Sequence, residues 1–134
     1  MLNINWFKSK KLTDVLYKTK RVKINGVLFD IRKINPLDYL SGAQVMQEFF
    51  SLYRSKPTNQ QVENLSQKVK SHYTDVFMAG VVKPNLSRKA DDGEFIYVGD
   101  IMVDMDMATK LYTEIYALTY GKKKMKVLHS PSLN

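Results

Sequence analysis

The chain has 134 residues, of which 44% are hydrophobic and 25% charged, and it contains no cysteine. This composition is that of an ordinary folded domain, and it excludes a disordered, collagen-like or disulfide-built chain. The formal net charge of +8 suggests a polyanionic partner, but the excess falls in residues 1–23 and 122–126, and the body between them is slightly acidic.

Residues 1–18 are expected to form a basic arm, either an amphipathic helix or a partly ordered segment. Lysines surround apolar residues whose spacing approximates one helical face. These apolar residues are Ile4, Phe7, Leu12, Val15 and Leu16. Trp6 adds a large aromatic side chain, so the arm is a candidate contact surface for another protein or subunit.

Residues 20–34 have the pattern of a β-hairpin. Two β-rich runs flank Asn25-Gly26, a dipeptide that tolerates the positive φ angles of a two-residue type I′ turn. The resulting register pairs Ile24 with Val27, Val22 with Phe29, Lys20 with Ile31, Lys23 with Leu28 and Arg21 with Asp30. One face is therefore apolar apart from Lys20, and the other carries a cross-strand ion pair.

Residues 35–53 are predicted to form the first main helix. Asn35 is the expected N-cap, Pro36 occupies the first helical position, and Asp38 adds an acid to the first turn. A wide apolar stripe follows, made of Leu37, Leu40, Val45, Phe49 and Leu52 with Met46, Phe50 and Tyr53 beside them. This width predicts a heavily buried helix.

The second main helix is expected to begin after Pro57, because Thr58 and Gln61 have the spacing of a capping box. Its apolar face comprises Val62, Leu65, Val69, Tyr73, Val76, Phe77 and Gly80. The helix should end between Gly80 and Lys83, before Pro84.

The last third of the chain begins with a polar loop over residues 85–93, the best candidate for a mobile segment. Residues 94–98 form either a short third strand or an extended lead-in. Residues 100–120 have the helical spacing of a third main helix, and Gly121 is placed as its C-cap. Residues 122–134 form a basic, flexible tail.

These elements predict an α+β fold in which an N-terminal β-hairpin precedes three main helices. Residues 19–121 make up one globular domain, flanked by the arm of residues 1–18 and the tail of residues 122–134. No internal repeat or second domain is evident.

Catalysis finds little support among the residues. The histidines are His72, for which we expect a structural or surface role, and His129 in the tail, and neither belongs to a nucleophile or Gly-rich motif. Asp100, Asp104 and Asp106 cluster, but on a helix Asp106 points away from the other two, so helix-start acids explain them better than a metal site. We therefore predict no enzyme, catalytic residue, metal or cofactor.

The basic ends leave several kinds of partner open. Trp6, Phe7 and Tyr17 alternate with lysines, as in stacking surfaces for single-stranded nucleic acid, and the arm could also fold on an anionic membrane surface. No recognised nucleic-acid motif is present, however, and only four of the 21 basic residues are arginine. A protein or subunit contact is therefore the preferred interpretation.

Neither a membrane span nor an export signal is expected. Apolar runs are interrupted long before the ~18 residues that a spanning helix needs. The first residues include Asn3, Asn5 and Lys8, so they lack the continuous apolar region of a signal peptide. With no cysteine, this favours an intracellular location.

The order of these features resembles that of the tail assembly chaperones of long-tailed, siphovirus-like bacteriophages. The resemblance covers roughly residues 20–124 and includes the hairpin around Asn25-Gly26, the helix start at residues 35–38, and a late helix closing on Gly121-Lys122. It implies a non-enzymatic protein of the host cytoplasm that coats the helical tape measure protein, keeps it soluble, and yields to tail tube subunits.

Members of that family are often made in two lengths by a programmed frameshift. Here Gly121 is followed by Lys122, Lys123 and Lys124, whose codons can form an adenine-rich slippery run. The sequence is thus compatible with a frameshifted longer form.

A chaperone for apolar helices needs adaptable apolar grooves. The methionines are gap-filling core residues or part of such a groove. Our candidate partner-binding residues are Trp6, Phe7, Leu12, Phe49, Phe50, Tyr53, Met102, Met105 and Met107. We expect them to be covered by self-association or by the tape measure protein. The alternatives are a structural virion component, such as a head-tail connector or tail completion protein, and a basic nucleic-acid-binding protein.

Overall fold

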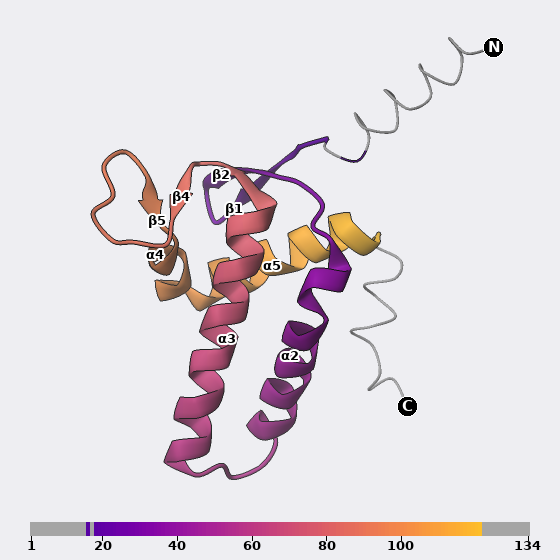
Figure 1. Ribbon diagram of the computed structural model, residues 1–134, viewed down its shortest axis with the longest axis vertical. Helices are drawn as coiled ribbons and strands as arrows, with labels where there is room; N and C mark the ends of the chain where they lie inside the picture. Colours follow the sequence, from indigo (N-terminus) through magenta and orange to yellow (C-terminus); the bar gives the residue numbers. More distant parts are fainter. Residues whose placement is uncertain (1–15, 17, 122–134) are drawn as a thin grey trace, which may run out of the picture.

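A computed structural model describes residue 16 and residues 18–121, which are coloured in Figure 1. Most of the basic arm, including Trp6, Phe7 and Leu12, and the tail with His129 lie outside the described residues. The predictions made for these two segments therefore stay predictions.

The predicted hairpin is confirmed residue by residue. Strands β1 (Lys20–Ile24) and β2 (Val27–Ile31) pair antiparallel in the expected register. Asn25 has a φ of 50° and Gly26 a φ of 86°, the left-handed values that a type I′ turn requires. On the outer face, Arg21 Nε lies 2.9 Å from Asp30 Oδ1, so the cross-strand ion pair also forms as expected.

The hairpin gains a third strand from a distant part of the chain. Strand β3 (Val81–Lys83) pairs antiparallel with β2, which gives the order β1-β2-β3. The short strand expected near residues 94–98 is present as β5 (Ile96–Tyr97), but it pairs in parallel with β4 (Leu86–Ser87) in a separate two-stranded sheet. The hairpin thus gains one strand, β3, and β1 remains at the edge of the sheet.

The first two helical segments begin at the predicted caps. Asn35 caps a short 3-10 helix η1 (Pro36–Tyr39), accepting a hydrogen bond from Leu37 N at 3.1 Å, and α2 (Leu40–Tyr53) follows. Helix α3 (Asn59–Gly80) begins with a complete capping box, in which Thr58 and Gln61 bond reciprocally. Local side-chain chemistry therefore sets both starts.

The third predicted helix is divided in two. Helix α4 (Val98–Val103) ends at Asp104, whose extended φ and ψ of −101° and 97° break the helix before α5 (Met105–Tyr120) begins. Asp104 Oδ1 accepts a hydrogen bond from Met107 N at 3.1 Å and so caps α5. At the far end, Gly121 is the C-cap with a φ of 89°, as predicted.

The core lies where the inner face of the hairpin meets α5 and the C-terminal part of α3. Its largest fully buried side chains are Phe77, Ile31, Leu111, Ile115, Val76 and Val98. In Figure 1, α5 crosses behind the upper halves of α2 and α3, and the lower halves of these two helices project beyond it. The buried residues of α3 accordingly begin only at Leu65. The molecule therefore carries a projecting helical hairpin on a packed α+β base.

Candidate protein-binding surfaces

Helix α2 meets α3 at a close approach between Gly42 and His72. A Cβ placed on Gly42 would lie 1.8 Å from Nδ1 of His72, so only glycine fits there. The other ring nitrogen of His72, Nε2, lies 2.8 Å from the hydroxyl of Tyr112 on α5. The rings of Tyr112, Tyr116 and Tyr120 are neighbours and form an aromatic row along α5. The junction thus ties three helices together.

The electrostatics of this junction suit a structural role. His72 is buried, with 6% of its surface exposed, and this desolvation lowers its pKa below the ordinary 6.5 while the charge of Asp75 opposes the shift. Burial also raises the pKa of the Tyr112 hydroxyl. Both groups are therefore neutral near pH 7, and their hydrogen bond satisfies polar atoms inside the core.

The acidic cluster that the sequence singled out has structural partners. Asp104 caps α5. Asp106 Oδ2 accepts a hydrogen bond from Asn25 Nδ2 at 3.0 Å and forms an ion pair with Lys110 Nζ at 2.9 Å. Lys110 and Asn25 hold the pKa of the Asp106 carboxyl below its usual value. Among the described residues, no group of three or more His, Cys, Asp or Glu side chains is arranged to hold a metal ion.

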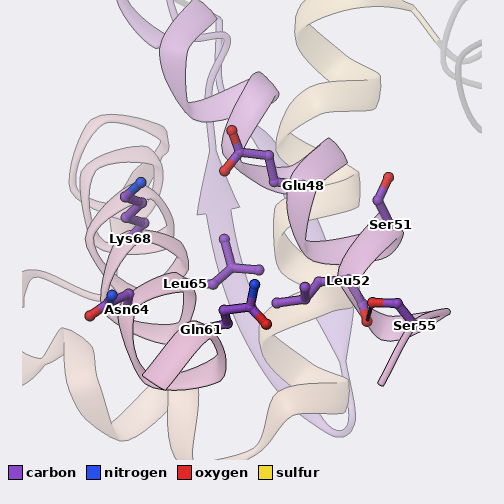
Figure 2. Close-up of a pocket in the computed structure, with 8 residues that line it drawn as sticks. All are labelled: Glu48, Ser51, Leu52, Ser55, Gln61, Asn64, Leu65 and Lys68. Carbon is purple, nitrogen blue, oxygen red and sulfur yellow. Dashed lines mark hydrogen bonds between the residues drawn. The ribbon is translucent and has the colours of Figure 1, made fainter. Parts of the chain in front are cut away.

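A groove opens between the projecting parts of α2 and α3, with a volume of about 450 Å³. Figure 2 shows Leu52 of α2 and Leu65 of α3 directed into the space between the helices, where they form its apolar floor. Polar side chains surround this floor, namely Glu48, Ser51, Ser55, Gln61, Asn64 and Lys68. An apolar floor with a polar rim is the usual construction of a site for an amphipathic helix.

The rim of the α2–α3 groove carries opposite charges on its two sides. Glu48 lies on α2 and Lys68 on α3 (Figure 2), and within the described residues neither belongs to an ion pair. Both charges are therefore available to groups on a molecule that enters the groove.

A second apolar surface lies at the junction of α4 and α5. Val103 is 84% exposed and Met105 48% exposed, and the two residues flank the break at Asp104. Met102 and Met107 are instead partly buried against the core. Of the candidate methionines, Met105 is thus the most accessible, and the other two serve mainly to fill the core.

The structure does not bring the aromatic candidates together with the methionines. Phe49 is partly buried against the core on α2, while the side chains of Phe50 and Tyr53 on the same helix fall outside the described part. Helix α3 packs against both α2 and α4, and in Figure 1 it lies between them. Phe49 and the candidate methionines therefore belong to two separate surfaces.

Sequence patterns missed several surface features. Leu37 and Leu40 are 73% and 60% exposed at the start of the first helical segment, although their spacing placed them on the buried stripe. The α2–α3 groove was also missed, because its shape depends on how two helices diverge. One local signal was present. The first turn of α3, directly after the cap at Thr58, is polar, which indicates that this end of the helix lies outside the core.

None of the helices in residues 16 and 18–121 has both the length and the apolar character needed to cross a membrane. The chain matches no protein-family model, and comparison with curated proteins and with solved structures found no similar protein.

Proposed function

We propose that the chain is a non-enzymatic tail assembly chaperone of a long-tailed bacteriophage, acting in the host cytoplasm. Its partner is an amphipathic helical segment of the tape measure protein, which lays its apolar side chains into the α2–α3 groove. Tail tube subunits displace the chaperone as the tail is built, and the chaperone associates with itself when the tape measure protein is absent.

The observation that carries this proposal is the groove itself. Leu52 and Leu65 form an apolar floor between two helices whose lower halves project beyond α5 in Figure 1. Glu48 and Lys68 on opposite sides can pair with charges of either sign on the polar flanks of that helix. The resemblance of the sequence to tail assembly chaperones supports the same partner.

Exposed apolar side chains elsewhere support binding to a long partner. Val103 and Met105 lie at the α4–α5 junction, and Leu37 and Leu40 lie at the start of η1 and α2. A protein that coats an extended helical partner needs several weak apolar contacts rather than one deep pocket. Such dispersed contacts allow many similar helices to bind without strict geometry.

The groove is tested with the variant Leu52→Asp, co-expressed with a helical segment of the tape measure protein. The variant places a charge on the apolar floor, and burying that charge under a helix is strongly unfavourable. We expect at least about tenfold weaker binding in a pull-down and loss of soluble tape measure protein. Gln47→Asp is the matched control, because it adds the same charge to an exposed position of α2 outside the groove.

Three results would contradict the proposal. Equal binding by Leu52→Asp and Gln47→Asp would remove the groove from the interface. Mass spectrometry that finds the protein in purified virions would favour a connector or completion protein, because an assembly chaperone leaves before the particle is complete. Binding to nucleic acid that falls steeply with salt would favour a basic nucleic-acid-binding protein instead.

A further inference from the structure

The edge of the sheet formed by β1 has unpaired backbone groups. In the β1-β2-β3 sheet, β1 pairs on one side only. Because Ile24 and Val27 flank a two-residue turn, they are a hydrogen-bonded pair, and so are the pairs at Val22 and Lys20. The N–H and C=O groups of Arg21 and Lys23 must therefore point away from β2.

These outward groups are free to bond to another chain. No described residue makes a hydrogen bond to the backbone N–H or carbonyl of Arg21 or Lys23. Exposed edge strands present such groups as a template for an added strand. Proteins commonly protect an edge with charges or bulges, and β1 has charges but a regular register.

A cleft lies beside this edge, with a volume of about 290 Å³. Its walls are one end of the hairpin and the exposed side of α5, formed by Lys23, Ile24, Asn25, Thr109, Lys110, Thr113 and Glu114. No residue of β2 lines it, so the cleft belongs to the free side of β1. A strand edge beside a helix is the arrangement that recognises extended peptides by strand addition.

Polar contacts fix the spacing between β1 and α5 at both ends of the cleft. At one end, Lys20 Nζ lies 3.7 Å from Glu114 Oε2. At the other, Asn25 bonds to Asp106 Oδ2 at 3.0 Å and to Lys110 Nζ at 3.1 Å. These contacts link the hairpin to α5 before any partner arrives, and such preorganisation lowers the entropic cost of binding.

The charge of β1 identifies the chemistry of the partner. Lys18, Lys20, Arg21 and Lys23 occupy a stretch of six residues, and within the described chain Lys18 and Lys23 have no ion-pair partner. Opposite charges on adjacent strands stabilise a sheet, and like charges directly opposite destabilise it. The residues of an added strand that face Arg21 and Lys23 should thus be acidic.

The same rule argues against a second copy of this chain at the edge. Two β1 strands paired antiparallel about Val22 would place each Arg21 opposite the other copy's Lys23. Both contacts would join like charges. A symmetric dimer through β1 is therefore disfavoured, and a different, acidic chain fits better.

We propose that the free edge of β1 and the adjoining α5 cleft bind an extended acidic segment of another protein as a fourth strand. Its backbone pairs with the outward groups of Arg21 and Lys23, its carboxylates face their side chains, and one side chain enters the cleft. This surface is distinct from the α2–α3 groove, so the inference goes beyond the proposed function, and either can fail without the other.

The test is fluorescence anisotropy of the full chain with a labelled octapeptide of alternating glutamate and valine. The comparison peptide has the same sequence with N-methylated glutamates, which keeps the charge but removes the N–H donors that face Arg21 and Lys23. We expect the valine peptide to bind on the order of tenfold more tightly than the N-methylated peptide. Equal binding of the two peptides, or no binding of the valine peptide, would overturn the proposal.

Two variants at one position separate backbone pairing from charge. Lys23→Ala removes the charge and keeps the outward N–H, while Lys23→Pro removes both and leaves the bonds to β2 in place, because this N–H points away from β2. We expect Lys23→Pro to bind on the order of fivefold more weakly than Lys23→Ala. Equal affinities of these two variants would contradict strand addition.

Thr113→Trp provides an independent check, since it fills the cleft from α5 without changing β1. It should weaken binding of the valine peptide on the order of tenfold. Ser66→Trp, which adds the same side chain at an exposed position of α3 outside the cleft, is the matched control and should bind as the native chain does. If an oligonucleotide of equal charge displaces the peptide and binds more tightly, the edge serves nucleic acid and the proposal fails.

Discussion

Gly42 and His72 illustrate how single residues set the packing of whole helices. Glycine in the middle of a helix is less favourable than alanine, yet α2 carries it where the imidazole of His72 would otherwise collide with a side chain. The hydrogen bond from His72 to Tyr112 extends the contact to α5. Helix α2 thus contains a residue of low helix propensity at the position where only glycine allows close contact with α3.

The first prediction concerns Gly42→Ala. Helix propensity alone would stabilise the protein by about 1 kcal/mol, but the new Cβ would overlap the ring of His72, and such overpacking typically costs about 1–3 kcal/mol. We expect a net decrease in the free energy of unfolding, measured by urea denaturation. Ser41→Ala, at an exposed neighbouring position, should leave it nearly unchanged. A more stable Gly42→Ala protein would show that the ring moves aside freely.

The second prediction is a loss of stability in mild acid. Burial lowers the pKa of folded His72 below 6.5, so the unfolded chain binds the proton more readily. The free energy of unfolding should therefore decrease as the pH falls from 6.5 towards the pKa of the folded state. Asp30 and Asp106 also have lowered pKa values in the folded protein. Their contribution to the free energy of unfolding is lost only when the pH falls below 3.8, the ordinary pKa of an aspartate.

Urea denaturation at several pH values between 7.5 and 5 measures this effect. His72→Gln keeps a polar group opposite Tyr112 but does not titrate, so its free energy of unfolding should vary much less over that range. An equal decrease in the native protein and in His72→Gln would assign the effect to other groups.

At the scale of elements, Asp104 divides what the sequence presents as one helix. The helical spacing of Ile101, Met105 and Ala108 continues across the break, so periodicity alone could not reveal it. Val103 and Met105 flank the break and form the exposed apolar surface at the α4–α5 junction.

The third prediction is that Asp104→Ala weakens the start of α5. Loss of the bond to Met107 N should lower the free energy of unfolding by about 1 kcal/mol. Asp104→Asn is the matched control, because asparagine is an equally good N-cap and should preserve stability. Thermal unfolding of the two variants measures the difference in stability. If Asp104→Asn loses as much stability as Asp104→Ala, the carboxylate acts through its charge rather than as a cap.

A feature could be predicted from the sequence where the residues that determine it are close together along the chain. The hairpin register was predictable because the turn at Asn25-Gly26 and the alternation on both strands are local, and so were the caps at Asn35 and Thr58. The pairing of β3 with β2 was not, because it joins segments about 50 residues apart. The α2–α3 groove and the free edge of β1 depend on tertiary placement, so neither of these two proposed binding surfaces could be located from the sequence.

At the scale of the whole molecule, a packed base carries a less buried helical hairpin. The buried residues of α3 lie between Leu65 and Gly80, and its first six residues contribute none to the core. Stability should therefore vary along the helix, because segments with few buried apolar contacts open locally at low free energy. The proposed binding groove is in the part that opens most easily.

The fourth prediction is a gradient of hydrogen exchange along α3. Backbone amides near Leu65 should exchange faster than those near Val76, and those of Leu111 on α5 should be as slow as the slowest in α3. Thr58→Ala should accelerate exchange in the first turns of α3 but leave Val76 unchanged, since the cap acts locally. Adding a helical tape measure segment should slow exchange around Leu52 and Leu65, because the partner covers the groove. Uniform protection along α3 would instead mean that the projecting hairpin unfolds only together with the base.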